Sequence, residues 1–321
     1  MKRTLHRVAA AVFSIWLFAI PVFAADTLIP VGQVVGLELR SGSVTVAAFD
    51  DAVTAARDAG LQIGDEIRAI DGKTVTCAED VRSALNRSRG SVTLTVLRDG
   101  CETELRLEPA ISREGPKMGV FLRQGITGLG TVTFYDPDTG KFGTLGHGVS
   151  DRNGALLPMT EGTVYPAEVI RIQKGRCGAP GQLKGALDGN QVLGSLSKNT
   201  HRGVFGTVHP AWSGDALPVA AAAEVHTGPA TIRSTIDESG PREYSVEIVK
   251  IYPRNRSDGR NLLLRVTDPD LLAATGGIVQ GMSGSPIIQD GKLVGAVTHV
   301  LVNDPTRGYG IFIENMLEAA A

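Results

Sequence analysis

The chain is poor in the residue types that mark several other classes of protein. Its three cysteines, Cys77, Cys101 and Cys177, leave at least one thiol unpaired, and no cluster of histidines and cysteines has the spacing of a zinc site. Lys and Arg (32) nearly balance Asp and Glu (34), and aromatic residues amount to 5%. No basic stretch interleaved with aromatics is therefore available to nucleic acid, and we expect no nucleic-acid partner, no metal and no cofactor.

Long apolar runs are also missing after residue 25. Residues 1–25 open with basic residues, continue with an apolar stretch over 8–23 and end in small residues around Ala24, which predicts a targeting segment. The apolar stretch is shorter than the ~20 residues that span a bilayer comfortably, so the segment is either a cleaved signal peptide or a retained signal anchor. We expect an exported, extracytoplasmic chain that is held at the membrane only if this segment is kept.

Glycine, by contrast, is abundant, and apolar runs of strand length follow one another between turns rich in Gly, Pro, Asp and Asn. Glycine suits tight turns better than long packed helices. The pattern predicts a mainly β protein. From residue 119 to residue 321 it contains eight or more strand-like segments, which favours a closed barrel or a sandwich of antiparallel strands.

Residues 28–110 form a smaller unit of short strands and helical segments. The sequence GLQIGDEI at 60–67, followed by Ile70-Asp71-Gly72, resembles the signature of PDZ domains. That resemblance implies a small α/β module that binds a peptide as an added strand at the edge of its sheet. Residues 111–118, which include a Gly-Pro pair, have the composition of a linker to the second domain.

A loop of backbone N–H groups receives the end of the peptide in PDZ domains. Val35, Gly36, Leu37 and Glu38 resemble this carboxylate loop, and the helical segment 78–86 would form the other wall of the groove. The alternative is a PDZ fold that serves only as a scaffold and binds no peptide.

The sequence GMSGSP at 281–286 precedes an apolar strand, a turn and a second strand, and it resembles the G-x-S-G-G-P loop of chymotrypsin-like peptidases. Small residues beside the serine let the backbone turn so that the N–H groups of Gly281 and Ser283 can point together at an oxyanion. Ser283, rather than Ser285, occupies the position of the nucleophile. The alternative is a glycine-rich lead into a hairpin without chemistry.

A serine hydroxyl needs a neighbouring base, which is most often a histidine. His147 lies between glycines in the sequence LGHGVSD, a setting that leaves the ring open to a substrate, and we assign it as the general base. His299 is the rival because it follows Ser283 closely, although the alternation around it is also that of an ordinary strand residue.

The C-terminal half resembles one chymotrypsin-like subgroup, the sporulation stage IV B peptidases. The sequences that carry the resemblance are LGHGVSD, LLLRVTDPDLL, TGGIVQGMSGSPIIQDGKLVGAVTHVLVNDP and the PDZ signature. The resemblance implies a catalytic triad of His147, Asp268 and Ser283. Asp268 also precedes a proline in a pattern typical of a helix cap, and Asp151 and Asp188 are the rival acids.

The same resemblance implies a function. It is that of a secreted regulatory serine endopeptidase that processes itself near its N-terminus. The enzyme then cuts an extracytoplasmic segment of a membrane-bound metalloprotease complex during sporulation, which leads to activation of a late sigma factor. Two alternatives stay open: an HtrA-like quality-control protease, although those place the PDZ domain after the catalytic domain, and a non-catalytic PDZ protein of an envelope assembly.

Overall fold

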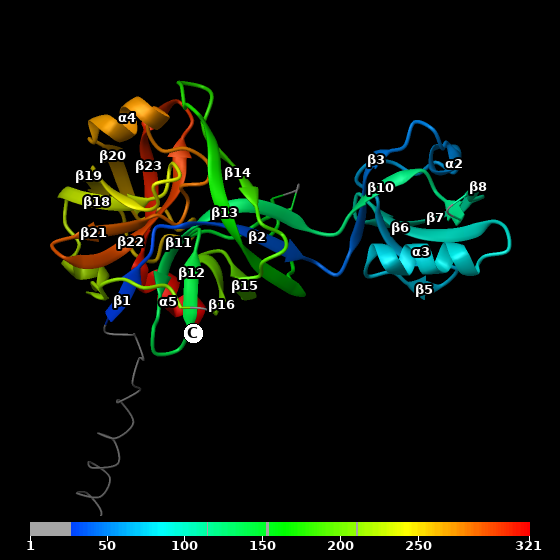
Figure 1. Cartoon of the computed structure of the whole chain (residues 1–321), viewed down its shortest axis with the longest axis horizontal. Helices are drawn as coiled ribbons and strands as arrows, with labels where there is room; N and C mark the ends of the chain where they lie inside the picture. Colours follow the sequence, from blue (N-terminus) through cyan, green and yellow to red (C-terminus); the bar gives the residue numbers. More distant parts are fainter. Residues whose placement is uncertain (1–26, 114, 152–153, 210) are drawn as a thin grey trace, which may run out of the picture.

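The computed structural model describes residues 27–113, 115–151, 154–209 and 211–321. The targeting segment expected at 1–25 lies outside these residues. In the part of the chain that is described, no helix is both long enough and apolar enough to cross a bilayer. Figure 1 shows two lobes joined by two chain connections, a larger lobe built mainly from strands and a smaller one of strands and helices.

The first half of the larger lobe is a ring of six antiparallel strands, which we call the first barrel. In chain order they are β2 (Val34–Arg40), β11 (Ile126–Tyr135), β12 (Lys141–Thr144), β13 (Glu161–Gln173), β15 (Gly194–Thr200) and β16 (Gly203–Val208). They pair in the order β2-β11-β12-β16-β15-β13, and the pairing of β13 with β2 closes the ring. Buried apolar side chains such as Val35, Phe142 and Val164 form its core. Three strands extend it: β1 (Thr27–Pro30), β14 (Gln182–Leu187) and β17 (Leu217–Pro218).

The second half is a closed six-stranded barrel, the second barrel. Its strands are β18 (Gly228–Ser234), β19 (Arg242–Ile251), β20 (Leu262–Val266), β21 (Pro286–Gln289), β22 (Lys292–Leu301) and β23 (Asp304–Phe312). The short helix η1 (Ala222–Glu224) precedes β18, and helix α4 (Pro269–Thr275) follows β20. Fully buried residues, among them Ile232, Ile248 and Leu264, fill the interior. Burial of this kind is the main favourable contribution to folding.

The smaller lobe is a six-stranded sheet with two helices. Its strands are β3 (Val44–Phe49), β4 (Glu66–Ile70), β5 (Lys73–Thr74), β6 (Val92–Arg98), β7 (Cys101–Leu107) and β10 (Val120–Arg123). Their order is β10-β3-β4-β6-β7, with β5 beside β4. Strands β8 (Ala110–Ser112) and β9 (Gly115–Lys117) form a separate hairpin, and the helices are α2 (Ala55–Asp58) and α3 (Ala78–Arg87). Val81 and Leu85 of α3 pack on the buried face of the sheet.

The smaller lobe is inserted into the first barrel instead of preceding it. The chain leaves the barrel after β2 and returns at β11, where Ile126 pairs with Leu39, so the two connections start side by side (Figure 1). Residues 28–40, expected in the PDZ unit, therefore belong to the barrel sheet. The expected linker 111–118 holds the β8–β9 hairpin and the buried Met118, and β10 completes the small sheet. An alternating apolar pattern fits any half-buried strand, which is why it does not reveal the sheet that β2 joins.

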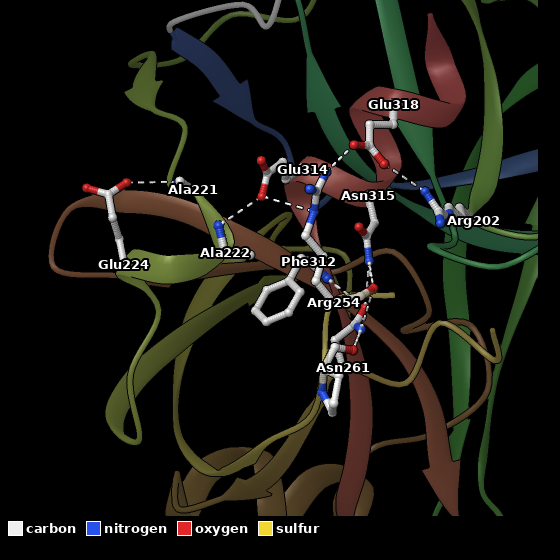
Figure 2. A network of polar contacts seen from close by, with 11 residues as sticks. Arg202, Ala221, Ala222, Glu224, Arg254, Asn261, Phe312, Glu314, Asn315 and Glu318 are labelled. Atoms are coloured by element: carbon white, nitrogen blue, oxygen red, sulfur yellow. Dashed lines mark hydrogen bonds and ion pairs between the residues drawn. The ribbon is translucent and has the colours of Figure 1, made fainter. Parts of the chain in front are cut away.

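The C-terminal helix α5 (Ile313–Ala320) is tied to both barrels by polar contacts (Figure 2). Glu318 pairs with Arg202 of the β15–β16 turn at 2.9 Å and with Arg254 of the loop after β19. Asn315 Nδ2 donates to Asn261 Oδ1 at 2.9 Å and to the Arg254 carbonyl at 3.0 Å. Both asparagines are fully buried. These contacts hold the loop between β19 and β20 against the helix.

Candidate active site

The turn after β12 carries His147. The strand ends at Thr144, and both Leu145 and Gly146 have a φ of 68°. A positive φ is unfavourable for leucine, and here it is held by the packing of a buried side chain. A Cβ at position 146 would lie 2.9 Å from Thr298 Cγ2, so glycine lets the turn approach β22 of the second barrel. The turn therefore places His147 at the junction of the two barrels.

The half-buried ring of His147 is held by a backbone carbonyl. Its Nδ1 lies 2.9 Å from the carbonyl oxygen of Gly148. Because a carbonyl can only accept, this hydrogen bond assigns the proton to Nδ1 and leaves the lone pair on Nε2. Burial lowers the pKa of His147 below its ordinary value, and the bond to Gly148 opposes that shift. A neutral ring with a free lone pair on Nε2 is the form that a general base requires.

The loop 281–285 lies directly before β21 and is anchored to β11 of the first barrel. The N–H of Thr131 donates to the Ser283 carbonyl at 2.9 Å, and the Thr131 hydroxyl donates to the Gly281 carbonyl at 2.8 Å. Gly284 has a φ of 98°, and a Cβ there would lie 1.9 Å from the Thr131 carbonyl oxygen, closer than real contacts permit. Glycine at 284 is therefore needed for the loop to meet β11.

The two serines of this loop have different surroundings. The hydroxyl of Ser283, which is partly exposed, donates to the Thr298 carbonyl at 2.6 Å. Ser285 is fully buried, and its hydroxyl bonds to the Met282 carbonyl at 2.7 Å and to Ser234 Oγ at 3.0 Å. Ser283 is thus the serine of the loop that a substrate can reach.

The backbone N–H groups of the loop divide in the same way. Those of Met282, Gly284 and Ser285 donate to carbonyls within the protein. Those of Gly281 and Ser283 have no acceptor within the described residues. Two free N–H groups that flank the reachable serine are what an oxyanion hole requires, and they are the two that the sequence predicts.

His299 lies beside Thr298 on β22, and its ring meets that of His147. The ring centroids are 4.9 Å apart and the planes are inclined by 38°. The sequence treats the two histidines as rivals for one role, whereas the structure brings them together. The pairing of β22 with β23 shifts register between Val297 and His299, and such a bulge redirects side chains. A bulge is not visible in a strand's alternation pattern, so this contact was missed.

Asp268 is the N-cap of helix α4. Its Oδ1 accepts the N–H groups of Asp270 and Leu271 at 3.0 Å each, and its Oδ2 accepts the N–H of Ser245 at 3.2 Å. No hydrogen bond in the described part of the chain joins it to His147. The structure therefore shows the capping role that the Asp-Pro sequence also indicates, and it does not bring Asp268 to the histidine as the implied triad requires.

The rival acids lie in turns of their own. Asp151 Oδ1 accepts the N–H of Ala155 at 3.0 Å, and Asp188 Oδ1 accepts the N–H of Asn190 at 3.1 Å.

Among the residues that the structure describes, no group of three or more His, Cys, Asp and Glu side chains could hold a metal ion.

The expected carboxylate loop at Val35, Gly36, Leu37 and Glu38 is corrected by the structure. These residues lie within β2, where both strand edges are already paired, one with β11 and the other with β13. A strand paired on both sides has no N–H groups left for a peptide end. The sheet of the smaller lobe has an edge strand at each end of its order, β7 and β10, and β10 exposes Phe121.

Comparison with known proteins extends these observations. Proteins of Rhizobium meliloti and Agrobacterium fabrum that are named as zinc metalloproteases are 29% identical over 125 residues and 37% identical over 90 residues. The matched stretches cover 39% and 28% of this chain, but only 31% and 23% of those proteins.

Among solved structures, the Rv3671c protease of M. tuberculosis in its active form is 15% identical with a TM-score of 0.35, over 61% of this chain and 73% of that chain. Its inactive form is 16% identical with a TM-score of 0.32, over 61% of this chain and 82% of that chain. A PDZ domain profile matches residues 34–108. The profile of the SpoIVB peptidase S55 family matches residues 114–317, more than half of the sequence, and the chain therefore belongs to this family.

Proposed function

We propose that the protein is a serine endopeptidase with Ser283 as nucleophile and His147 as general base. The observation that carries the proposal is the meeting of two loops, one from each barrel. Ser283, whose loop has two free N–H groups, contacts Thr298 of β22, and the neutral ring of His147 contacts the next residue, His299. Membership of a serine peptidase family supports the same assignment.

The geometry supports a specific sequence of events. The Ser283 hydroxyl turns from the Thr298 carbonyl towards Nε2 of His147, which takes the proton as the oxygen attacks the peptide carbonyl. The carbonyl oxygen, now negative, binds the N–H groups of Gly281 and Ser283. The imidazolium then gives its proton to the departing amine. Water repeats the sequence on the acyl-enzyme and releases the second product.

A groove beside Gly281 is the proposed site for the substrate chain. It has a volume of about 530 Å³ and runs between β11, β14 and the residues before Ser283. Its lining is mixed, with Leu129 and Leu187 beside the polar side chains of Gln182, Lys184 and Gln280. A segment of a peptide or protein substrate with both apolar and polar groups would fit this lining.

A fluorophosphonate probe tests the proposed activity directly, because it forms a covalent bond only with an activated serine. We expect labelling at Ser283, identified by mass spectrometry of the labelled peptide, and loss of labelling in His147→Ala. A folded wild-type protein that is not labelled would favour a non-catalytic PDZ protein instead.

The smaller lobe is proposed to bind a peptide along β10, whose outer edge is unpaired. The support is the order of the strands together with the exposure of Phe121 on that edge. Binding of a fluorescent peptide library, compared between the wild type and Leu122→Pro, would show whether this edge takes an added strand.

For the biological role we propose, from family membership, a regulatory peptidase of sporulation. It would trim itself near its N-terminus and then cut the extracytoplasmic part of a membrane-bound metalloprotease complex. Self-processing is tested by N-terminal sequencing of the full chain after export. A shortened N-terminus in the wild type that is absent in Ser283→Ala supports the proposal, and identical N-termini contradict it.

A further inference from the structure

His299 and the residue before it contact the proposed catalytic pair, and the proposed reaction leaves these contacts unexplained. The carbonyl of Thr298, the residue before it, accepts the Ser283 hydroxyl at 2.6 Å. The ring of His299 lies against the ring of His147, with centroids 4.9 Å apart. Two successive residues of β22 therefore contact the nucleophile and the base.

A ring nitrogen of His299 is buried without a partner. Its Nδ1 has no hydrogen bond within the described residues. A buried polar atom without a partner is costly, and in a native structure such an atom requires an explanation. A neutral imidazole offers one acceptor nitrogen and one donor nitrogen, so His299 can still interact with a charge that develops nearby.

The charge that develops nearby is that of His147. When His147 takes the serine proton it becomes an imidazolium in a half-buried place, which is unfavourable without compensation. In serine peptidases with a triad, an aspartate supplies that compensation. Here the oxygens of Asp268 bind the N–H groups of Asp270, Leu271 and Ser245. The side chain that does lie against the His147 ring is His299.

We propose that His299 is a positioning residue of the catalytic unit, a neutral imidazole that fixes the ring of His147 and stabilises its imidazolium during attack by Ser283. This inference rests on the proposed peptidase function. His299 is suited to the role because burial, followed by repulsion from His147 and Arg260, lowers its pKa to about 4. It therefore stays neutral while His147 accepts a proton, and the weaker influence of Asp258 acts in the opposite direction.

The test compares His299→Phe, which keeps a ring but has no nitrogen, with His299→Gln, which keeps a polar acceptor. We expect kcat in His299→Phe to fall by about 10- to 100-fold, by analogy with the loss of a partner that orients a metal-bound histidine, with KM unchanged. The acid limb of the kcat/KM profile should move to lower pH, because the imidazolium of His147 loses stabilisation while Arg260 and Asp258 remain. His299→Gln should recover most of the rate.

The matched control is His226→Gln, since His226 is an exposed histidine paired with Asp290. It should keep the wild-type rate and acid limb. A folded His299→Phe with the wild-type kcat and acid limb overturns the inference. Equal losses in the Phe and Gln variants with an unmoved acid limb also overturn it, because they indicate packing alone.

A measurement without turnover covers the case in which His299→Phe does not fold. NMR titration of His147 in a Ser283→Ala background should give a lower pKa for His147 in His299→Leu than in His299→Gln, and equal values contradict the proposal. Fluorophosphonate labelling of the wild type distinguishes a failure of the proposed peptidase function from a failure of the inference about His299. An unlabelled Ser283 overturns the proposed function, whereas a labelled Ser283 with unaffected His299 variants overturns only this inference.

Discussion

The two barrels of the larger lobe have the same strand order but different connections. Numbered along the chain, the strands of each barrel pair in the cyclic order first, second, third, sixth, fifth, fourth. The connection after the third strand carries His147 in the first barrel. In the second barrel it carries Asp268 with helix α4 and then the Ser283 loop. The shared framework thus fixes where connections emerge, and the residues within them decide what each one does.

The largest effect on activity should come from replacing Ser283, which lies in the connection after β20 of the second barrel. Ser283→Ala should lower peptide hydrolysis by ~10⁴-fold or more, since removing one member of an interdependent catalytic unit abolishes the nucleophilic route. Ser285→Ala removes a buried hydroxyl with two hydrogen bonds and should lower the melting temperature while most of the activity remains. Equal rate losses in the two folded variants would refute the assignment.

The contact between the barrels depends on Gly284, for which Gly291 is a matched control. Gly284 and Gly291 both have a positive φ, but a Cβ would strike the Thr131 carbonyl only at position 284 and would meet nothing within 4 Å at position 291. Both alanine variants carry the conformational cost, and Gly284→Ala should cost about 1–3 kcal/mol more, as overpacking does. Urea unfolding and labelling of Ser283 would measure this. Similar stabilities would mean that the two loops do not meet as described.

Asp268 permits a test that separates a cap from a catalytic acid. From its contacts with Ser245, Asp270 and Leu271, we expect Asp268→Asn to lose at most about 0.5–2 kcal/mol of stability and to keep its rate per folded molecule. If Asp268 were instead the aspartate of a triad, the same substitution would lower turnover by ~10⁴-fold. Such a loss in a folded Asp268→Asn, with Asp151→Asn unaffected, would restore the triad that the family resemblance implies.

Protonation of His147, the proposed base in the first barrel, should determine the acid limb of the pH profile of kcat/KM. Only the neutral ring of His147 can take the serine proton, so activity falls as pH falls through its pKa. Burial lowers that pKa in the folded protein, so the acid limb should lie below the ordinary histidine value of about 6.5. Stopped assays of kcat/KM between pH 4 and pH 8 measure it. An acid limb above 6.5 would point to a different base or to a more exposed ring.

The sequence predicted much of this arrangement because the site depends on local features. Gly281 to Pro286 and the glycines around His147 are short motifs whose backbone demands can be recognised without a structure. The mainly β fold class and the presence of a PDZ domain could likewise be predicted from the sequence. What could not be read depends on pairing between distant segments: β2 in the barrel instead of the PDZ sheet, and the bulge that turns His299 towards His147. Asp268 shows a further limit, because a cap and a catalytic acid can share one local sequence.

The double connection between the lobes affects how a captured protein would be presented to the barrels. A module joined by one flexible tether explores all orientations, whereas two short connections that start at paired strands remove much of that freedom. A chain held on the smaller lobe would therefore be confined to a limited volume around the larger one, and its local concentration there would exceed that in bulk solution. Recruitment of this kind selects cleavage sites by their distance from the recruiting segment as well as by their sequence.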